Sequence, residues 1–269
     1  MTMHGYDAEA VRAAEAPALA AGRPLMRWAA LQVAATVRQV LAEARVPLRT
    51  ARVLVLVGGG NNGGDGLHAA ADLAGRGVAV TAVLAREEVH RGGLDRARAA
   101  GVHLLPVTGA EDLTGRAWQE TARAAHVWVD ALAGIGVRGG LRGHTADLVG
   151  ALTALRAETH RAGPAGPAGP AGPGSPGGPA ASAASAHPAG LAVVAIDTPS
   201  GIAADTGRLD GPFLSADHTV TMGAAKAGLL LPPAALHTGT VQVADLGLGE
   251  AFAAQSPTVS RLQAEDVAA

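Results

Sequence analysis

The 269-residue sequence contains no cysteine. Disulfide bonds, thiolate catalysis and cysteine-based metal sites are therefore excluded, and this absence is typical of cytoplasmic proteins. Strong charge of either sign is also lacking, because the formal net charge is −2 at pH 7 and charged residues make up only 16% of the chain. This balance gives no electrostatic reason to expect nucleic acid or a membrane surface as a partner.

Long uninterrupted apolar segments are missing as well. The N-terminus carries Asp7 and Glu9 rather than a basic segment followed by an apolar one, and Arg27 interrupts the apolar region near residues 25–36. We therefore predict neither a signal peptide nor a transmembrane helix. The chain length and the hydrophobic content of 48% are sufficient for one large α/β domain or two small ones.

Lysine is almost absent from the chain. Of the 21 lysines and arginines, only Lys226 is a lysine. The sequence is rich in alanine, glycine, arginine and proline, which indicates that nucleotide composition is the background cause. Lys226 is either a chance exception to this preference for arginine or occupies a position where only a compact amine with a tunable pKa is accepted. Composition alone leaves both interpretations open.

The order of the apolar segments indicates the fold class. Residues 7–45 have apolar positions at helical spacing, with Gly22 and Pro24 as a break between two helices. Seven apolar runs then predict strands, and alanine-rich helical segments separate the first five, which is typical of a mostly parallel sheet covered on both faces. The last strands follow one another too closely for crossover helices, and the turn sequence "LDGP" at 209–212 lies between them. The predicted strands are 53–57, 78–84, 102–107, 126–130, 191–196, 218–222 and 240–244.

A Gly/Pro/Ala-rich insertion occupies residues 162–190. Glycine recurs at every third position from Gly163 to Gly172, but these triplets are too few for a collagen triple helix. The segment has nothing apolar enough to bury and cannot offset the entropy lost on ordering. We predict a disordered, flexible surface loop that tolerates deletion.

Polar or glycine-rich loops follow three of the predicted strands, at residues 58–66, 130–143 and 197–207. Open parallel sheets bind their ligands at the carboxyl ends of the strands, so we expect these loops to converge on one edge of the sheet. A fourth segment, which begins at Thr221, brings Lys226 just beyond another strand.

The residue types in these loops suit particular ligands. The glycines expose backbone N–H groups, and a helix starting near Gly64 adds its positive end, which together suit a pyrophosphate. Asn62, Asp130 and Ser200 supply oxygens of the kind that a weakly bound monovalent cation accepts. Asp197 is then the carboxylate left for proton transfer.

Each of these features also has a simpler interpretation. The G-x-G-x-x-G pattern on Gly58, Gly60 and Gly63 occurs in ordinary strand-to-helix turns as well as in dinucleotide-binding proteins. An aspartate at the end of a strand often caps a turn or a helix, and Ser200 can do the same. The convergence of three such loops favours a functional site.

Several stretches closely resemble the NAD(P)H-hydrate epimerase family. These are "GGGNNGGDGL", "VDALAGIGVRGGLRG", "AIDTPSGIAADTG" and "ADHTVTMGAAKAGLLLPP", followed by "GTVQVADLGL". The resemblance runs from the "RPLMRWAA" helix to Leu248 and leaves out the insertion. It implies a three-layer αβα sandwich with a Rossmann-like sheet, a cytoplasmic homodimer and one potassium ion per subunit.

The resemblance also implies the activity, which is a metabolite repair step. Members of the family interconvert the R and S epimers of hydrated NADH and NADPH, damaged cofactors with a hydroxyl on C6 of the nicotinamide ring. Asp197 carries over as the catalytic residue, an acid for the leaving hydroxyl and then a base for the returning water. Potassium ligands fall on Asn62, Asp130 and Ser200. Substrate contacts fall on Asn61, Asn62, Gly63, Gly64, Asp65, Gly134, Ile135, Gly136, Val137, Arg138, Gly139, Gly140 and Asp197, and Lys226 is expected either to hold the phosphates or to tune Asp197.

The sequence departs from the family pattern at two places. "LMRWAA" has Ala30 where the family has glycine after an alanine, so packing or the dimer contact there is expected to differ. Ala133 stands where an aromatic residue is usual, which predicts a more open pocket wall. Two other functions remain as alternatives, an NAD(P)-dependent oxidoreductase and a non-catalytic scaffold on the same fold.

The C-terminal stretch "SRLQAEDVAA" resembles a connector in two-domain members of the family. There it leads into an ADP- or ATP-dependent NAD(P)H-hydrate dehydratase domain. We therefore expect an epimerase domain at 1–250 and a tail or the start of a linker at 251–269, and a fused or separate dehydratase as a partner.

Overall fold

The computed structural model describes residues 2–136, 139–161 and 191–262. Val137, Arg138 and the insertion at 162–190 lie outside these ranges, so the expectations that concern them stay predictions. No helix within the described ranges is long and apolar enough to cross a membrane, as we expected.

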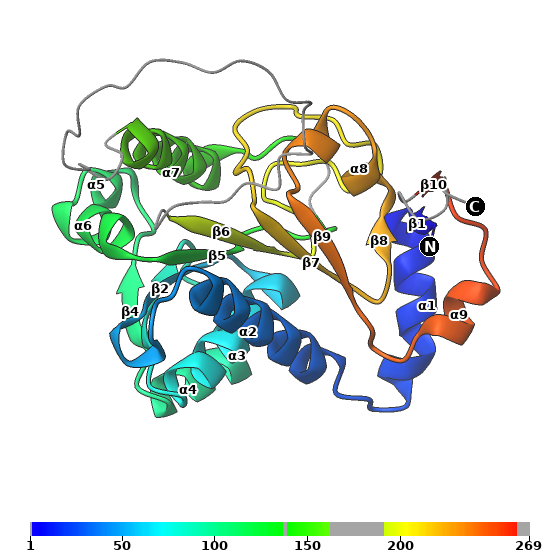
Figure 1. The fold of residues 1–269 in the computed structure, drawn as a ribbon, viewed down its shortest axis with the longest axis horizontal. Coiled ribbons are helices and arrows are strands. Elements are labelled where there is room, and N and C mark those ends of the chain that lie inside the picture. The colour runs from blue at the N-terminus through cyan, green and yellow to red at the C-terminus, as the bar shows by residue number, and fades with distance from the viewer. Residues whose placement is uncertain (1, 137–138, 162–190, 263–269) are drawn as a thin grey trace, which may run out of the picture.

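A seven-stranded parallel sheet forms the centre of the fold (Figure 1). All seven predicted strands are present within one or two residues of their expected bounds, and each pairs with its neighbour in parallel. The order across the sheet is β4-β3-β2-β5-β6-β7-β9. The strands are β2 (Arg52–Val57), β3 (Ala79–Leu84), β4 (His103–Pro106), β5 (Val127–Ala131), β6 (Ala192–Ile196), β7 (His218–Met222) and β9 (Thr240–Ala244).

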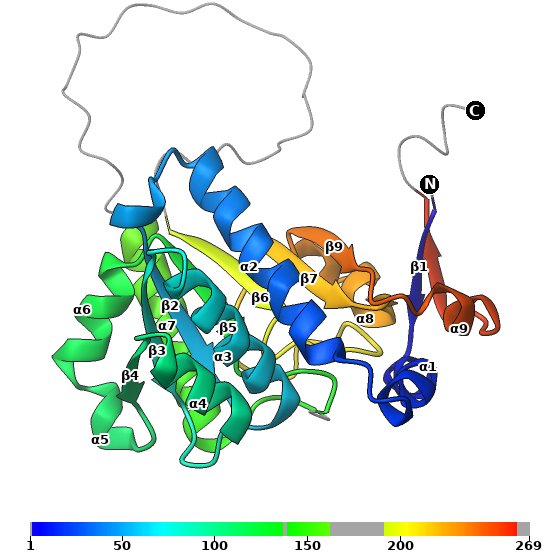
Figure 2. The same cartoon turned by 90° about the horizontal axis from the view of Figure 1, so that it is seen from below.

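Helices cover both faces of this sheet, which makes the predicted three-layer arrangement (Figures 1 and 2). Alternate residues of β2 divide between two cores, since Val55 packs with the helices of one layer and Leu56 with those of the other. The first layer contains α2 (Leu25–Glu43), α3 (Gly60–Ala74) and α4 (Arg91–Ala99), and the second contains α6 (Arg116–Ala124) and α7 (Gly143–Arg161), with the short α5 (Ala110–Leu113) beside them.

The two predicted N-terminal helices are α1 (Ala8–Ala20) and α2, and the break between them contains Gly22 and Pro24, as expected. Gly22 has φ +69°, a conformation that glycine adopts without a steric penalty. The chain between β6 and β7 has no helix, whereas α8 (Ala227–Leu230) makes a single short turn between β7 and β9. The expectation of no crossover helices between the last strands is therefore confirmed.

Helix α3 begins at Gly60, and the predicted start near Gly64 is wrong by about one turn. The glycines and asparagines of this segment have low helix propensity, which favoured a loop in the sequence. Gly60 has φ +74° and Gly59 is the N-cap, so glycine makes the turn from strand to helix possible. Consequently Asn61, Asn62 and Asp65 lie in the first turns of a helix, with their side chains at its positive end.

A second, three-stranded sheet was not predicted. It consists of β1 (Met3–Tyr6), β8 (Ala225–Lys226) and β10 (Val259–Arg261), in the order β10-β1-β8. β1 pairs in parallel with β8, which places Tyr6 opposite Lys226, and α1 follows immediately. The C-terminal segment contributes α9 (Gly249–Ala253) and β10, which pairs antiparallel with β1. The domain boundary at residue 250 stays a prediction.

Candidate active site

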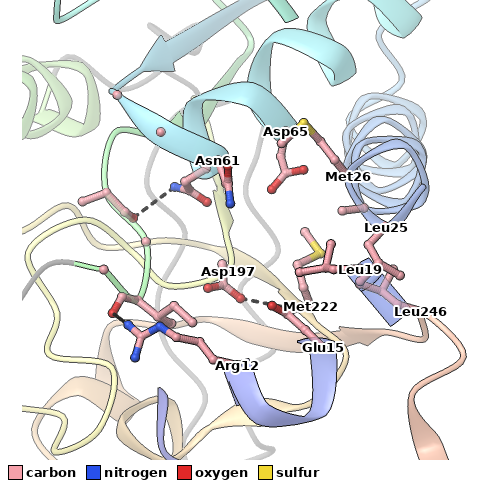
Figure 3. A pocket seen from close by; sticks show the side chains of 18 of the residues that line it. Arg12, Glu15, Leu19, Leu25, Met26, Asn61, Asp65, Asp197, Met222 and Leu246 are labelled. Atoms are coloured by element: carbon pink, nitrogen blue, oxygen red, sulfur yellow. Dashed lines mark hydrogen bonds between the residues drawn. The ribbon is translucent and has the colours of Figure 1, made fainter. Parts of the chain in front are cut away.

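A cavity of about 690 Å³ lies at the carboxyl ends of the central strands (Figure 3). Helix α1 closes one side, the first turns of α2 and α3 form another, and the loop after β5 forms a third. Three acidic side chains from separate elements line it, namely Glu15 of α1, Asp65 of α3 and Asp197 after β6. The predicted convergence of strand-end loops is thus present in the fold, because 58–66, 130–136 and Asp197 all reach this cavity.

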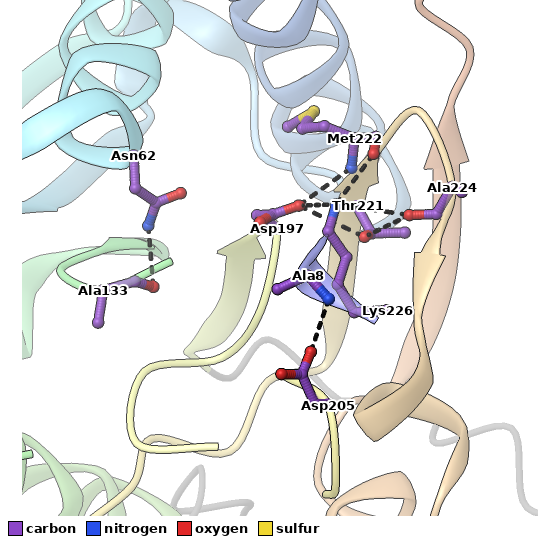
Figure 4. Close-up of polar contacts among 9 residues, drawn as sticks. All are labelled: Ala8, Asn62, Ala133, Asp197, Asp205, Thr221, Met222, Ala224 and Lys226. Carbon is purple, nitrogen blue, oxygen red and sulfur yellow. Dashed lines mark hydrogen bonds and ion pairs between the residues drawn. The ribbon is translucent and has the colours of Figure 1, made fainter. Parts of the chain in front are cut away.

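Asp197 follows β6 directly and has φ +67°, a left-handed conformation that non-glycine residues rarely adopt. Its backbone N–H donates to Val220 O at 2.7 Å, and its Oδ1 accepts from the backbone N–H of Met222 at 3.2 Å (Figure 4). The side chain is buried apart from the part that lines the cavity. The backbone of β7 therefore fixes the carboxylate in place.

Lys226 is fully buried and forms an ion pair with Asp197 Oδ1 (Figure 4). Its Nζ also donates to Met222 O at 2.9 Å, and Ala224 O lies at 3.4 Å. Lys226 is not among the residues that line the cavity. Of its two expected roles, this position supports tuning of Asp197 rather than contact with phosphates, because a buried ammonium stabilises the ionised carboxylate.

The three predicted potassium ligands are connected through Ala133. Ser200 Oγ donates to Asp130 Oδ1 at 2.6 Å and accepts from Ala133 N at 3.0 Å. Asn62 Nδ2 donates to Ala133 O at 3.0 Å, so its amide oxygen points away from that carbonyl (Figure 4). Asp130 is fully buried, and burial raises its pKa although hydrogen bonds from Ser200 oppose the shift. An ionised Asp130 would therefore benefit from a positive charge beside it.

Asp65 projects from α3 into the cavity (Figure 3). Burial raises the pKa of this carboxyl group well above its ordinary value, and the negative charges of Asp197 and Glu15 add to the shift. Its Oδ1 is shielded from solvent and has no hydrogen-bond partner among the described residues. An unpaired buried carboxylate is costly, so the environment favours the neutral acid.

Glu15 is a site residue that sequence reasoning missed. Burial raises its pKa, the charge of Lys226 opposes this shift, and that of Asp197 adds to it. Two contacts fix α1 beside the strand ends, because Asp205 Oδ1 accepts from Ala8 N at 2.7 Å and Arg12 donates to Ile135 O at 2.9 Å. No distinctive signal marks it in the sequence, because Glu15 is one of three charged residues on α1, with Glu9 and Arg12, and such side chains are usually solvated.

Two glycines of the expected substrate loops lie where neighbouring backbone segments approach closely. A Cβ on Gly58 would lie 1.9 Å from Leu132 O, and one on Gly63 would lie 2.1 Å from Gly58 O. These two glycines let β2, α3 and the loop after β5 approach one another. Gly134, Ile135 and Gly136 line the cavity, Gly63 and Gly64 lie buried in α3, and Gly139 has φ +78°.

A second cavity of about 920 Å³ continues beyond Gly59 and Gly60, which line both. Leu132 and Ala133 also line both cavities, and Gly140 lines only the second. The side chains of the second cavity include Arg86, Arg142 and His144. The two cavities together offer an elongated site that runs across the N-terminus of α3.

Comparisons with known proteins identify the family of this chain. Residues 22–228 match the model of the family described as "YjeF-related protein N-terminus". The chain is 39% identical to the NAD(P)H-hydrate epimerase of Clavibacter michiganensis, over 91% of this chain and 90% of that one. It is 40% identical to the NAD(P)H-hydrate epimerase of Microbacterium testaceum, over 95% of this chain and 83% of that one.

The chain is also similar to a longer, bifunctional protein and to one solved structure. The chain is 33% identical to the bifunctional NAD(P)H-hydrate repair enzyme Nnr of Mycobacterium leprae, over 99% of this chain but 45% of that one. The crystal structure of the yeast protein YNL200c superposes with a TM-score of 0.56 at 18% identity, over 81% of this chain and 76% of that one, which shows a shared fold. The family match and the identity near 40% over almost the whole length establish that the chain belongs to the NAD(P)H-hydrate epimerase family.

Proposed function

We propose that this protein is an isomerase that interconverts the R and S epimers of hydrated NADH and NADPH. The observation that carries the proposal is the buried Asp197–Lys226 pair at the end of β6, which presents a fixed carboxylate to a cavity large enough for a nicotinamide nucleotide. The relatives named NAD(P)H-hydrate epimerase support the same activity.

The reaction requires a hydroxyl to leave C6 and water to return to the opposite face. The ring nitrogen lone pair expels the hydroxyl once it is protonated, and water then attacks the planar iminium. We assign Asp197 as the base for the incoming water, since its carboxylate lines the cavity and is held in an ion pair with Lys226. Backbone N–H groups at the start of α3 face the same site and suit the pyrophosphate. The second cavity offers room for the rest of the dinucleotide.

We also propose one potassium ion per subunit, held by Asn62, Asp130 and Ser200. The donor set fits, since it combines an amide oxygen, a hydroxyl and a buried carboxylate whose hydrogen bonds come from the uncharged donors of Ser200 and Leu132. When bound, the ion would neutralise Asp130 and hold the loop after β5 in place. No cluster of three or more His, Cys, Asp or Glu side chains suited to a metal ion occurs in the ranges that the structure describes.

Potassium binding can be measured without an activity assay. An ion that binds only the folded state raises the midpoint of thermal unfolding. We expect a higher midpoint in potassium than in sodium chloride at equal ionic strength, and no such difference in the Asp130→Asn variant. Equal midpoints of the wild-type protein in both salts would contradict the proposed ion.

Three further expectations remain part of the proposal. A homodimer is supported by the exposed apolar side chains Trp28 and Leu31 on one face of α2. A dehydratase partner is supported by the bifunctional relatives named Nnr. A cytoplasmic location is supported by the cysteine-free sequence.

The direct test of the activity is chromatographic. Purified protein in potassium buffer is incubated with the isolated R epimer of hydrated NADH, and the appearance of the S epimer is followed against a control without protein. We expect acceleration over the spontaneous reaction. A rate equal to that of the control, with fold and dimer intact, would favour the non-catalytic scaffold, and reduction of NAD(P)⁺ by an added substrate would favour the oxidoreductase.

A further inference from the structure

The proposed epimerisation needs an acid as well as a base. The assignment of this acid to a residue rests on the proposed function. The hydroxyl leaves one face of the ring and water enters from the other, so proton transfer is required on both sides. Asp197 is in contact with the buried ammonium of Lys226, which favours the ionised carboxylate and suits the base. A second group must therefore supply the proton to the leaving hydroxyl.

Asp65 has the placement that this role requires. It enters the cavity from α3, whereas Asp197 and Glu15 enter from the side of β6 and α1 (Figure 3). A planar ring in the cavity can lie between the two groups. The solvent-shielded Oδ1 of Asp65 has no hydrogen-bond partner among the described residues, so neither water nor a protein donor stabilises an ionised carboxylate at this oxygen. Burial raises the pKa of Asp65 well above its ordinary value, and the neighbouring carboxylates of Asp197 and Glu15 add to the shift, which favours the protonated acid.

The charged groups around Asp65 come from three elements. Asp197 and Glu15 favour its protonated form, and Lys226 opposes them from behind Asp197. Arg12 of α1 lines the same cavity but donates to Ile135 O. The remaining neighbours contributed by α2 are apolar, namely Leu25, Met26 and Ala29.

We propose that Asp65 is the catalytic acid that protonates the leaving C6 hydroxyl, while Asp197 deprotonates the incoming water on the opposite face. Glu15 is a positioning residue whose negative charge helps Asp65 to keep its proton. Two carboxyl groups in different environments then perform the two proton transfers.

The bonds and protons balance in this scheme. The C6–O bond breaks, its electron pair takes the proton of Asp65, and water leaves while the ring nitrogen forms the iminium. Water then adds to C6 from the other face, and its proton goes to Asp197. One turnover leaves Asp65 ionised and Asp197 protonated, and exchange with solvent restores the starting state. In the reverse direction the two residues exchange roles.

The kinetic test compares Asp65→Asn with Asp147→Asn. The second variant makes the same chemical change on an exposed position of α7. General acid catalysis contributes about 100-fold or more, so we expect Asp65→Asn to lower kcat by at least that factor with KM nearly unchanged. Asp147→Asn should match the wild-type protein. A wild-type kcat in Asp65→Asn would overturn the assignment.

The pH profile separates a catalytic acid from a merely structural residue. Activity that needs protonated Asp65 is lost as pH rises through its raised pKa. Removing the negative charge of Glu15 lowers the pKa of Asp65, so Glu15→Gln should move the basic limb of the profile to lower pH. A basic limb that stays in place in Glu15→Gln, or that persists in Asp65→Asn, would contradict the proposal.

A third readout does not depend on activity. Because the pKa of Asp65 is raised in the folded state, the stability that its proton contributes is present below its unfolded value of 3.8 and is lost as pH rises through the folded value. The Asp65→Asn variant has no such loss, so its advantage in free energy of unfolding over the wild-type protein should grow as pH rises above about 4. A constant difference would overturn the proposal. A wild-type protein without epimerase activity would instead refute the proposed function, and with it the catalytic role of Asp65, whatever the titration shows.

Discussion

Asp197 holds a backbone conformation that residues with side chains rarely adopt, at φ +67°. Such a conformation costs on the order of 1–3 kcal/mol and persists only where surrounding contacts enforce it. Here the contacts are hydrogen bonds to Val220 and Met222 of β7, together with the ion pair to Lys226. The strain turns the carboxylate from the end of β6 into the cavity.

The buried Asp197–Lys226 ion pair leads to a prediction about the free energy of unfolding. Removing one partner of a buried ion pair leaves an unpaired buried charge, which costs about 3–5 kcal/mol, whereas removing both is far less harmful. We expect Lys226→Met and Asp197→Asn each to lower the free energy of unfolding, and the double variant to be more stable than Lys226→Met. Urea denaturation measures these differences. Additive losses in the double variant would show that the two side chains do not interact.

Gly58 and Gly150 form a matched pair for a second prediction. A Cβ on Gly58 would lie 1.9 Å from Leu132 O, while one on Gly150 in α7 meets nothing within 4 Å. Gly58→Ala should therefore destabilise the fold by about 1–3 kcal/mol or more, because backbone must shift. Gly150→Ala should stabilise it by up to about 1 kcal/mol through helix propensity. The unfolding midpoints of the two variants test both predictions, since Gly58→Ala should lower the midpoint and Gly150→Ala should raise it. An unchanged midpoint in Gly58→Ala would contradict the close packing of Gly58 against the Leu132 backbone.

At the level of elements, much of the fold could be predicted from the sequence. The inner strands β2, β5, β6 and β7 are apolar runs of five or six residues that are almost fully buried, and this pattern is read directly from the chain. The edge strands β4 and β9 are more exposed, but they too are short runs rich in apolar residues. The small sheet could not be predicted, since β1, β8 and β10 have only two to four residues each and no alternation. Their pairing depends on segments more than 200 residues apart.

Some residues of the candidate site could likewise be predicted from the sequence, and others could not. Asp197 directly follows β6, and Asp65 lies in the helix that follows β2, so the rule that ligands bind at strand ends was enough to predict that the two share a site. Glu15 could not be found in this way, because long-range contacts hold α1 at the cavity, among them the pairing of β1 with β8 and the hydrogen bond from Arg12 to Ile135 O. The contact of Asp205 with the start of α1 is equally invisible in the sequence.

The insertion after α7 provides the prediction at the element scale. Residues 162–190 lie outside the described ranges, and their composition offers nothing to a core. Replacing them with a Gly/Ser linker of ~8 residues should leave activity unchanged and the unfolding midpoint equal or slightly higher, because loop-closure entropy changes slowly with length. A large loss of stability or of epimerase rate would assign the insertion a role that its composition does not indicate.

At the scale of the whole molecule, α2 offers a surface for self-association. Trp28 and Leu31 are 36% and 39% exposed, and they lie three residues apart on one helical face. We expect a dimer by light scattering, and Trp28→Glu should convert it to a monomer because the charge cannot be buried at an apolar interface. The control is Leu236→Glu, which changes a more exposed apolar side chain elsewhere and should stay dimeric. A monomeric wild-type protein, or a dimeric Trp28→Glu variant, would contradict this expectation.

The fold and the family membership are consistent with a repair enzyme whose chemistry is carried by carboxyl groups. The cavity brings together three separate elements, because its carboxylates come from α1, α3 and the end of β6. The one lysine of the chain stabilises one of them from inside the core. This arrangement explains why an amine is retained in a chain whose other basic residues are arginines.

The most direct test of the account is the initial rate of R-to-S epimerisation by Asp197→Asn, with Asp147→Asn as the control for the same change at an exposed site. The account predicts that Asp197→Asn falls to the spontaneous rate while it still unfolds cooperatively, and that Asp147→Asn matches the wild-type protein. A wild-type rate in Asp197→Asn would contradict the central claim that this carboxylate performs the reaction.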